Sequence, residues 1–152
     1  MQVRLATPED RADVARLAQR YVDELPPAVP VRFEAAAFDE SFDRYLATAN
    51  PTVFVAEDRS GVVGVLVCSI QGFLTMSGLL THTDVIFVTP EKRGTRAASE
   101  LLSEFDRWSE NIGAVMSIGG NANSIHTRRT ASLYAKFGYS PVGVSMAKFR
   151  SG

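Results

Sequence analysis

The sequence predicts a mixed α/β fold in which one sheet has helices on both faces. Short runs of alternating or β-branched apolar residues indicate strands, and apolar residues at helical spacing indicate amphipathic helices. Along the chain these segments follow the order strand, two helices, three strands, helix, strand, helix and one or two strands. With 152 residues, 45% of them apolar, we expect a single domain over residues 1–152.

The N-terminal third reads as one strand and two helices. Residues 2–6 alternate between apolar and polar side chains, and Thr7-Pro8-Glu9-Asp10 has the N-cap, proline and acids of a helix start. Pro26, Pro27 and Pro30 end this helix, and a second one runs from about Glu34 to just before Pro51. The segment near 26–38 either lines a substrate cleft or is plain structure.

The middle of the chain predicts a hairpin and a strand. Residues 52–57 and 62–70 form the hairpin around a turn at 58–61, and 71–82 read as a looser connection with two glycines. This connection leads into a strand that ends at Val88. Its apolar side chains form either an exposed dimer contact or ordinary hairpin core: Phe73, Leu74, Met76, Leu79 and Leu80.

The last third predicts two helices and further strands. A helix follows Gly94 and stops at Gly113, and a short strand spans 114–118. After a loop at 119–123, a helix begins at about 124 or 127 and is stopped by Gly138. Tyr139 opens a further strand, and residues 142–149 alternate as the last one.

Residues 84–101 predict an anion site. A strand ending at Val88 is followed almost at once by a helix whose start has three cations, Lys92, Arg93 and Arg96, around Gly94. A helix N-terminus has roughly half a positive charge, so cations there are unfavourable unless an anion binds among them. Free N–H groups and small residues would complete a phosphate cradle. The alternative is a surface helix whose arginines face water.

Composition excludes several functional classes. A net charge of -1 gives no basic footprint for nucleic acid. No apolar run approaches the roughly 18 residues of a membrane span, and the N-terminus is not a signal peptide, so we expect no membrane contact and a cytoplasmic protein. Cys68 is the only cysteine, and we expect it to be a small buried side chain. With only two histidines besides, we expect no metal site.

Two motifs then resemble one family. Arg93-Gly-Thr-Arg-Ala-Ala98 is similar to a loop of pattern Arg/Gln-x-x-Gly-x-Gly/Ala, and Ala131-Ser-Leu-Tyr-Ala-Lys-Phe-Gly-Tyr-Ser-Pro141 nearly repeats a downstream helix motif. In this order, separated by one helix and one strand, they resemble the GCN5-related N-acetyltransferases (GNAT) over essentially the whole chain. The resemblance implies a twisted, mostly antiparallel central sheet of six to seven strands, with acetyl-CoA as cosubstrate and no metal. The RGTRAA loop is similar to phage- or prophage-encoded members.

The resemblance also implies the roles of individual residues. Tyr134 would be the general acid that protonates the departing thiolate, and Asp84 the base, directly or through water. Apart from the resemblance, His82 is a rival base, because an imidazole can accept a proton near neutral pH and its segment is expected close to the cleft. A backbone N–H near Val88 would polarise the thioester carbonyl. Arg96 stands where the family usually has Gly, and Thr127 replaces a frequent Asn. The implied cofactor-binding residues are Phe87, Val88, Arg93, Gly94, Thr95, Arg96, Ala97, Ala98, Asn123 and Tyr134.

Three functions are compatible with these features. The first is direct transfer of an acetyl group from acetyl-CoA to a primary amine of a small molecule or peptide. The second is a non-catalytic regulatory module that binds acyl-CoA, and the third is an acyltransferase that modifies a macromolecule. An acidic closed pocket would favour a polyamine or aminoglycoside, and an open cleft a peptide. A homodimer is favoured only because relatives commonly form one.

Overall fold

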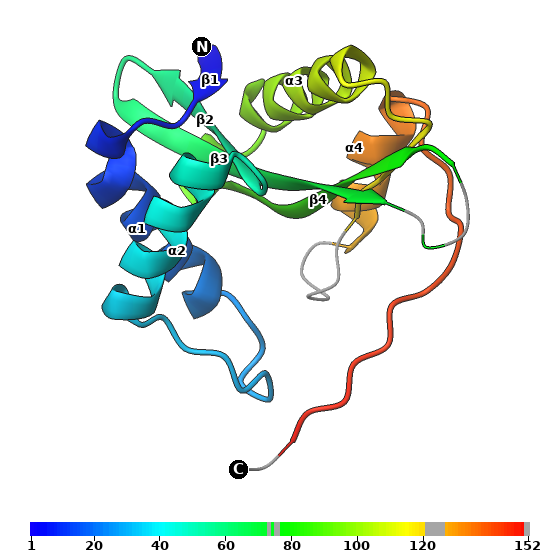
Figure 1. Cartoon of the computed structure of the whole chain (residues 1–152). Helices are drawn as coiled ribbons and strands as arrows, with labels where there is room; N and C mark the ends of the chain where they lie inside the picture. The colour runs from blue at the N-terminus through cyan, green and yellow to red at the C-terminus, as the bar shows by residue number, and fades with distance from the viewer. Residues whose placement is uncertain (73, 75–76, 121–126, 151–152) are drawn as a thin grey trace.

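The chain forms one mixed sheet of five strands in the order β1-β2-β3-β4-β5. The computed structural model describes residues 1–72, 74, 77–120 and 127–150. The first four strands pair antiparallel, and β5 pairs parallel with β4 (Figure 1). The mostly antiparallel fold is therefore confirmed, with five strands among the described residues instead of six or seven. The strands are β1 (Gln2–Leu5), β2 (Thr52–Asp58), β3 (Gly61–Gly72), β4 (Leu79–Val88) and β5 (Met116–Ile118).

Helices cover both faces of the sheet, as expected. The long helices are α1 (Arg11–Asp23), α2 (Ala35–Thr48), α3 (Ala97–Asn111) and α4 (Thr127–Lys136). Figure 1 shows α1 and α2 together on one face of the sheet, α3 along the other face, and α4 beside β4. Among the described helices, none combines the length and the apolar character that a membrane crossing requires.

Two hydrophobic cores result from this arrangement. Under α3, Leu101, Leu102 and Phe105 are fully buried against the sheet, and under α1 and α2, Leu17 packs against strand valines such as Val55. Each core forms because the strands alternate, so that successive side chains enter opposite layers. Cys68 lies in the α3 core, as expected, and burial raises the pKa of its thiol to about 12. It is an inert packing residue.

The start of α1 is held by a buried carboxylate. A single 3-10 turn, Pro8–Asp10, precedes α1, and Thr7 precedes it in the extended conformation of an N-cap. Asp10 accepts hydrogen bonds from Arg4 Nη1 at 2.7 Å, Arg4 Nη2 at 2.9 Å and the Thr7 N–H at 2.8 Å. Arg4 also bonds Glu57 at 3.0 Å, so β1, β2 and the helix start are tied together. The Arg4 guanidinium holds the pKa of the Asp10 carboxyl below its usual range.

We expect Asp10→Ala to lower the free energy of unfolding by about 2 kcal/mol, because it leaves the Arg4 guanidinium and the Thr7 N–H without their partner. Since the folded pKa of Asp10 is lowered, this contribution is present above the unfolded value near 3.8 and is lost as the pH falls through the folded value. Urea unfolding at pH 7 and pH 3 measures both effects. Glu40→Ala on exposed α2 is the control, and equal losses in the two variants would contradict the prediction.

The connection expected at 71–82 is wrong at both of its ends, 71–72 and 79–82. The β3–β4 ladder continues to the pair Gly72–Leu79, so these residues are hairpin strands around a short tip. Cross-strand hydrogen bonding imposes extended backbone here although the local pattern of side chains is irregular. Leu80 is buried, while Leu79 and Leu74 are exposed. Phe73 and Met76 lie outside the described residues.

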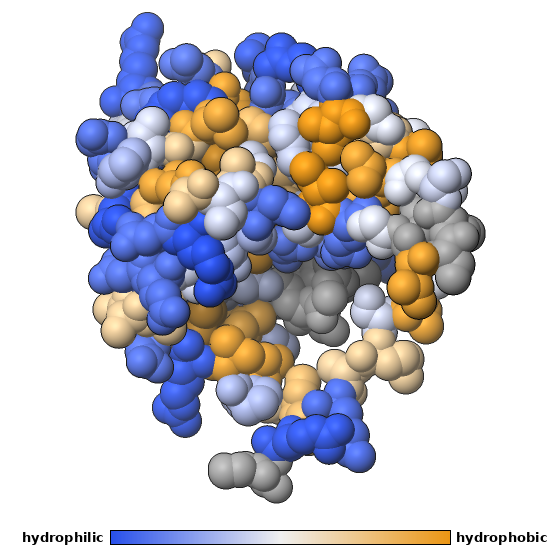
Figure 2. All heavy atoms as spheres, in the orientation of Figure 1, coloured by the Kyte–Doolittle hydropathy of each residue, from blue (hydrophilic) through white to orange (hydrophobic). Residues whose placement is uncertain are grey.

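The expected strand at 142–149 is also wrong. Residues 139–150 have neither helix nor strand, and the bulky apolar side chains from Val142 to Phe149 are exposed to solvent (Figure 2). Alternation makes a segment suitable for a strand, but a strand forms only where a neighbouring edge supplies hydrogen bonds. For the same reason β5 is limited to Met116–Ile118, the stretch that pairs with β4, instead of 114–118.

Candidate functional site

The candidate site begins where β4 and β5 part. β5 pairs with β4 only from Leu80 to His82, whereas β4 continues to Val88. Beyond His82, this edge of β4 has no neighbouring strand among the described residues. The Thr89 N–H donates to Val63 O of β3, so by the alternation of an antiparallel ladder Ile86 and Val88 turn their N–H groups to the open edge.

A β-bulge at Asp84 determines which side chains of β4 lie on each face of the sheet. Val85 pairs with Val67 and Thr83 with Cys68, so Asp84 is an extra residue on β4. The bulge shifts the alternation, and an unpaired residue of this kind is frequent next to active sites. Before the bulge, Thr83 faces α4, where its hydroxyl meets Tyr134. His82 and Asp84 consequently lie on the opposite face.

Tyr134 occupies the point where the strands separate. Its hydroxyl is 2.7 Å from Thr83 Oγ1, one residue beyond the last β4–β5 pair, and the side chain is buried. A Cβ on Gly119 would lie 2.1 Å from the Tyr134 ring, so only glycine permits the ring to approach the end of β5. Burial raises the pKa of the Tyr134 phenol, which therefore stays protonated at neutral pH.

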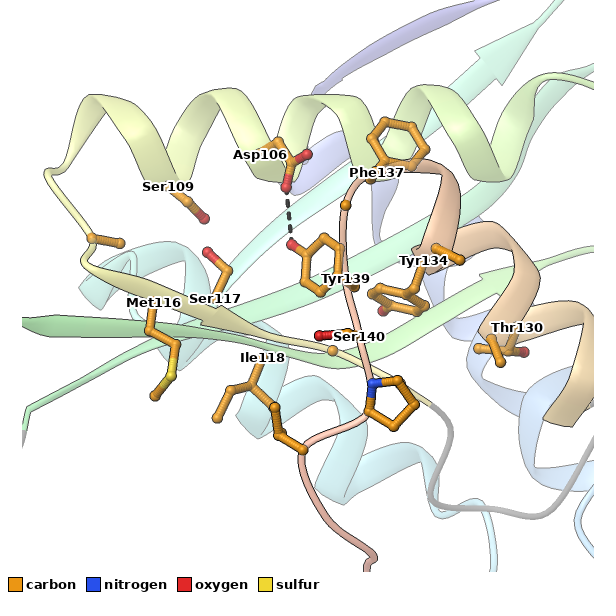
Figure 3. Close-up of a pocket in the computed structure, with 18 of the residues that line it drawn as sticks. Asp106, Ser109, Met116, Ser117, Ile118, Thr130, Tyr134, Phe137, Tyr139 and Ser140 are labelled. Atoms are coloured by element: carbon orange, nitrogen blue, oxygen red, sulfur yellow. Dashed lines mark hydrogen bonds between the residues drawn. The ribbon is translucent and has the colours of Figure 1, made fainter.

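Hydroxyl groups and a second tyrosine fix this position. Thr81 Oγ1 is 2.8 Å from Ser109 Oγ of α3 and 2.7 Å from Ser117 Oγ of β5. The Tyr139 ring meets that of Tyr134 edge to face at 5.1 Å, and its hydroxyl donates to Asp106 at 2.9 Å. Figure 3 shows Ser109, Ser117, Asp106, Tyr134 and Tyr139 in the lining of one groove. The volume of this groove is about 850 Å³. Desolvation raises the pKa of Asp106 and of Tyr139.

A histidine and two polar partners lie on the other face. His82 Nδ1 is 2.8 Å from Asp84 Oδ1, and Ser69 Oγ of β3 donates to the same oxygen at 3.0 Å. An ionised carboxylate only accepts hydrogen bonds, so Nδ1 bears the proton and Nε2 remains available as a base. The two residues expected as rival bases are therefore direct neighbours.

The loop before α3 presents unpaired N–H groups. Gly94 has φ +87°, a left-handed angle that glycine adopts without strain, while Arg96 has φ -78° and so avoids the strain that a non-glycine residue would otherwise meet. Thr95 Oγ1 accepts the Ala97 N–H at 3.3 Å. Within the described ranges, the N–H groups of Gly94, Arg96, Ala98 and Ser99 have no hydrogen-bond acceptor. Such a set of donors is suited to an anion.

The three cations near this loop are not equivalent. The Arg96 side chain is 76% exposed and meets only Glu100 at 3.2 Å. Arg93 is mostly buried: it donates to Glu24 at 2.8 Å and to Val88 O at 3.0 Å, and it lies 5.3 Å above the Phe87 ring. Lys92 pairs with Asp58 at 2.8 Å. Of the three, only Arg96 has a charged group that faces solvent almost freely. The expected ligand Asn123 lies outside the described residues.

A cavity of about 940 Å³ joins the loop to the open part of β4. The loop, β4 from Asp84 to Val88, the chain after α1, α4, and the C-terminal segment through Ser145, Ala147 and Phe149 form its walls. The segment after α1 therefore lines a cleft, one of its two expected roles. Its contribution is mostly apolar, and the carboxylates in the lining are Asp84 and the Arg93-paired Glu24. The lining side chains from α1 and the following segment are Tyr21, Glu24, Leu25, Pro26, Ala28, Val29 and Val31.

Comparison with known proteins identifies the family. A family model described as an acetyltransferase (GNAT) domain matches residues 49–141, which is more than half of the chain. The chain belongs to the GNAT family. The matched region contains β2 to α4, and with them the separation of β4 and β5, the loop before α3 and Tyr134. No curated protein matches the sequence significantly.

Solved structures share the GNAT fold. Glucosamine-6-phosphate N-acetyltransferase from Arabidopsis thaliana is 17% identical with a TM-score of 0.77, over 99% of this chain and 98% of that one. Aminoglycoside N-acetyltransferase AAC(6')-Iy in complex with CoA is 16% identical with a TM-score of 0.78, over 98% and 93%. A Clostridium acetobutylicum protein solved with acetyl-CoA is 13% identical with a TM-score of 0.75, over 97% and 95%. At these identities the likeness concerns the fold.

Some site residues were missed from the sequence. Thr83 and Ser69 contact the expected acid and base, and Gly119 makes room for the acid. Only Gly119 left a signal, in the adjacent pair Gly119-Gly120; the two hydroxyls belong to ordinary strand patterns. Over the described residues, no group of three or more His, Cys, Asp or Glu side chains could hold a metal ion.

We expect Gly119→Ala to lower the free energy of unfolding by about 2 kcal/mol, because the added methyl group overlaps the Tyr134 ring. The same substitution in a Tyr134→Leu background removes the ring atoms that it would meet and should cost less than half as much. Gly143→Ala, which meets nothing within 4 Å, is the control. Equal costs in both backgrounds, measured by urea unfolding, would exclude a direct contact.

Proposed function

We propose that the protein is an N-acetyltransferase that moves the acetyl group of acetyl-CoA directly to a primary amine of a small molecule or peptide. The observation that supports this most is the position of Tyr134, a buried and protonated hydroxyl at the point where β4 and β5 separate. Two further features support it: the unpaired N–H groups before α3 and the His82–Asp84 pair on the other face.

The loop before α3 would hold the phosphates of acetyl-CoA. Four N–H groups without acceptors and the exposed Arg96 guanidinium supply donors and charge for an anion. Arg93 would act mainly by fixing the shape of the loop, because its guanidinium is already bound to Glu24 and Val88 O. The N–H groups of Ile86 and Val88 on the open edge of β4 would bind the extended arm and the thioester oxygen.

Acid and base would act from opposite faces of the sheet. The amine nitrogen attacks the thioester carbon, a C–N bond forms and the C–S bond breaks. The departing thiolate takes the Tyr134 proton; burial raises the pKa of this phenol above its usual value of about 10, so the proton is held until the thiolate forms. The amine proton passes to His82 Nε2, whose ring Asp84 orients, or through water to Asp84 itself.

The residues that line the cleft favour one class of acetyl-group acceptor. Its acceptor side is mostly apolar, and Asp84 is the carboxylate not paired with a cation, whereas Lys92, Arg93, Arg129 and Lys136 also line the cavity. A polycation such as a polyamine would meet more positive than negative charge here. We therefore propose a single primary amine next to an apolar group, as in an apolar monoamine or a peptide N-terminus. The similarity of the RGTRAA loop to phage-encoded members stays a prediction.

We expect Arg96→Ala to weaken acetyl-CoA binding about tenfold, a loss of about 1.4 kcal/mol, with little change in stability. Arg93→Ala should lower the free energy of unfolding by about 1 to 3 kcal/mol as well, since it leaves Glu24 and Val88 O without their donor. Calorimetry and urea unfolding separate the two effects.

Arg107→Ala, an exposed change farther along α3, is the matched control and should bind as the wild type does. If the Arg96→Ala variant binds acetyl-CoA with wild-type affinity, Arg96 is not part of the phosphate site. No acetyl-CoA binding by the wild type would exclude the proposed function altogether, and saturable binding without turnover on a panel of amines would favour the non-catalytic regulatory module.

We expect Tyr134→Phe to lower kcat about 100-fold while acetyl-CoA binding is retained, because only the proton donor is lost. The raised pKa of Tyr134 places the alkaline decline of wild-type kcat above pH ~10, and the variant should lack this decline. Tyr45→Phe on α2 is the control. A Tyr134→Phe enzyme with wild-type kcat would contradict the role of this hydroxyl.

The same assay distinguishes the two bases. If His82 takes the proton and Asp84 orients its ring, His82→Gln should lower kcat/KM at least as much as Asp84→Asn does. If Asp84 acts alone, His82→Gln should retain the wild-type kcat/KM.

A further inference from the structure

Thr83 brings a second buried hydroxyl group to Tyr134. The two residues are 5% and 4% exposed, and their oxygens are 2.7 Å apart. Among the described residues, Tyr134 is the hydrogen-bond partner of Thr83 Oγ1. The bulge at Asp84 fixes the face on which Thr83 lies, and the absence of a side chain on Gly119 fixes how closely the Tyr134 ring approaches. The fold itself therefore sets the distance between the two hydroxyls.

The direction of this hydrogen bond depends on whether Tyr134 holds its proton. The protonated phenol needs an acceptor for its O–H, and Thr83 Oγ1 is the side-chain oxygen within reach. The Gly120 N–H also donates to the Tyr134 oxygen and cannot serve as that acceptor. A phenolate has no proton to donate, so the contact persists only if the Thr83 hydroxyl then becomes the donor. A hydroxyl can do this because it both donates and accepts and turns about its C–O bond.

The other groups around the phenol do not favour its ionised form. Desolvation raises the pKa of the phenol, and the negative charge of Asp106 on α3 acts in the same direction. Tyr139 meets the ring edge to face and donates its own hydroxyl to Asp106 (Figure 3). Cys68 of β3, in the same core, is a neutral thiol, and His82 and Asp84 lie on the opposite face of β4.

The two groups that act against this rise are Thr83 and the Gly120 N–H, whose hydrogen bonds lower the pKa of Tyr134. The N–H belongs to the backbone and donates in both protonation states. Thr83 is thus the described side chain that can change its hydrogen bond in response to loss of the Tyr134 proton.

We propose that Thr83 is a positioning residue for the general acid: its hydroxyl accepts the Tyr134 O–H in the resting enzyme and donates to the phenolate oxygen once the proton has left. This role rests on the proposed function, because it belongs to the proton transfer from Tyr134. In that step the phenol O–H bond breaks, the proton bonds to the thiolate sulfur, and the electron pair stays on the phenolate oxygen. The Thr83 hydroxyl only turns, and solvent later returns a proton to Tyr134.

Titration of the Tyr134 phenol tests the contact without any activity assay. Thr83→Val keeps the shape of the side chain but removes the hydroxyl, and the pKa of Tyr134 should rise by about one unit because the phenolate loses a donor. Fluorinated tyrosine, which titrates at lower pH than tyrosine, is incorporated at the four tyrosine positions and followed by fluorine NMR. The resonance that is missing in Tyr134→Phe identifies the ring.

Two further variants are the matched controls for this titration. Thr83→Ser keeps the hydroxyl and should titrate as the wild type does. Thr81→Val removes a buried hydroxyl from the same face of β4, where it contacts Ser109 and Ser117, and should leave the pKa of Tyr134 unchanged. An equal Tyr134 pKa in the wild type and in Thr83→Val would overturn the proposal.

Kinetics with the fastest-reacting member of a panel of amines tests the part that Thr83 has in the reaction. Thr83→Val should lower kcat up to about tenfold with an unchanged KM for acetyl-CoA, because the acid is weaker by about one pKa unit. Thr83→Ser should restore kcat, and a failure to restore it would overturn the proposal. A wild type that transfers no acetyl group would overturn the proposed function and this role with it, whereas the titration would still report the contact between Thr83 and Tyr134.

Discussion

The short pairing between β4 and β5 is the constraint on which the site depends. A parallel pair that continued along β4 would bury the edge groups of Ile86 and Val88 in a ladder and fill the space that Tyr134 occupies. The pairing stops because β5 ends at Ile118, and Gly119 then lets the tyrosine ring approach the backbone. The hydroxyls of Thr81, Ser109 and Ser117 hold the paired part in place. The part of β4 that pairs with β5, up to His82, is thus followed directly by the part without a partner on that edge among the described residues, which ends at Val88.

The bulge at Asp84 gives the two faces of β4 different chemistry. If the alternation continued from Thr83 through Asp84 without a bulge, Phe87 would lie in the α3 core instead of the α1 core, and the sheet would lose the close packing of both layers. With it, the tyrosine side is dry and keeps a phenol neutral, while the His82 side is open to solvent. Tyr134, proposed as the proton donor, and the His82–Asp84 pair, proposed as the acceptor, thereby lie on opposite faces of the sheet.

The two arginines of the loop before α3 differ in their surroundings: Arg93 is bound to other parts of the protein, and Arg96 is exposed to solvent. Arg93 links the end of α1 to the end of β4 through Glu24 and Val88 O, so the cleft wall and the loop have one common anchor. A buried pair of this kind fixes geometry more than it adds stability. Arg96 has no comparable anchor and remains free to meet an anion. Neighbouring arginines in one motif therefore have different physical roles.

The sequence by itself determined the order of the elements as far as α4, the two-layer cores, the helix stops and the family, because these depend on local periodicity, on glycine at positive φ and on motifs in fixed order. Tyr134 could likewise be named from its position in a motif, and Asp84 and His82 from their places on the segment that ends at Val88. Only the tertiary structure decided that His82 bonds Asp84, that Arg93 is committed to Glu24, and that residues 142–149 are not paired. Each of these depends on a partner distant in sequence or on an available edge, and local pattern contains no information about either.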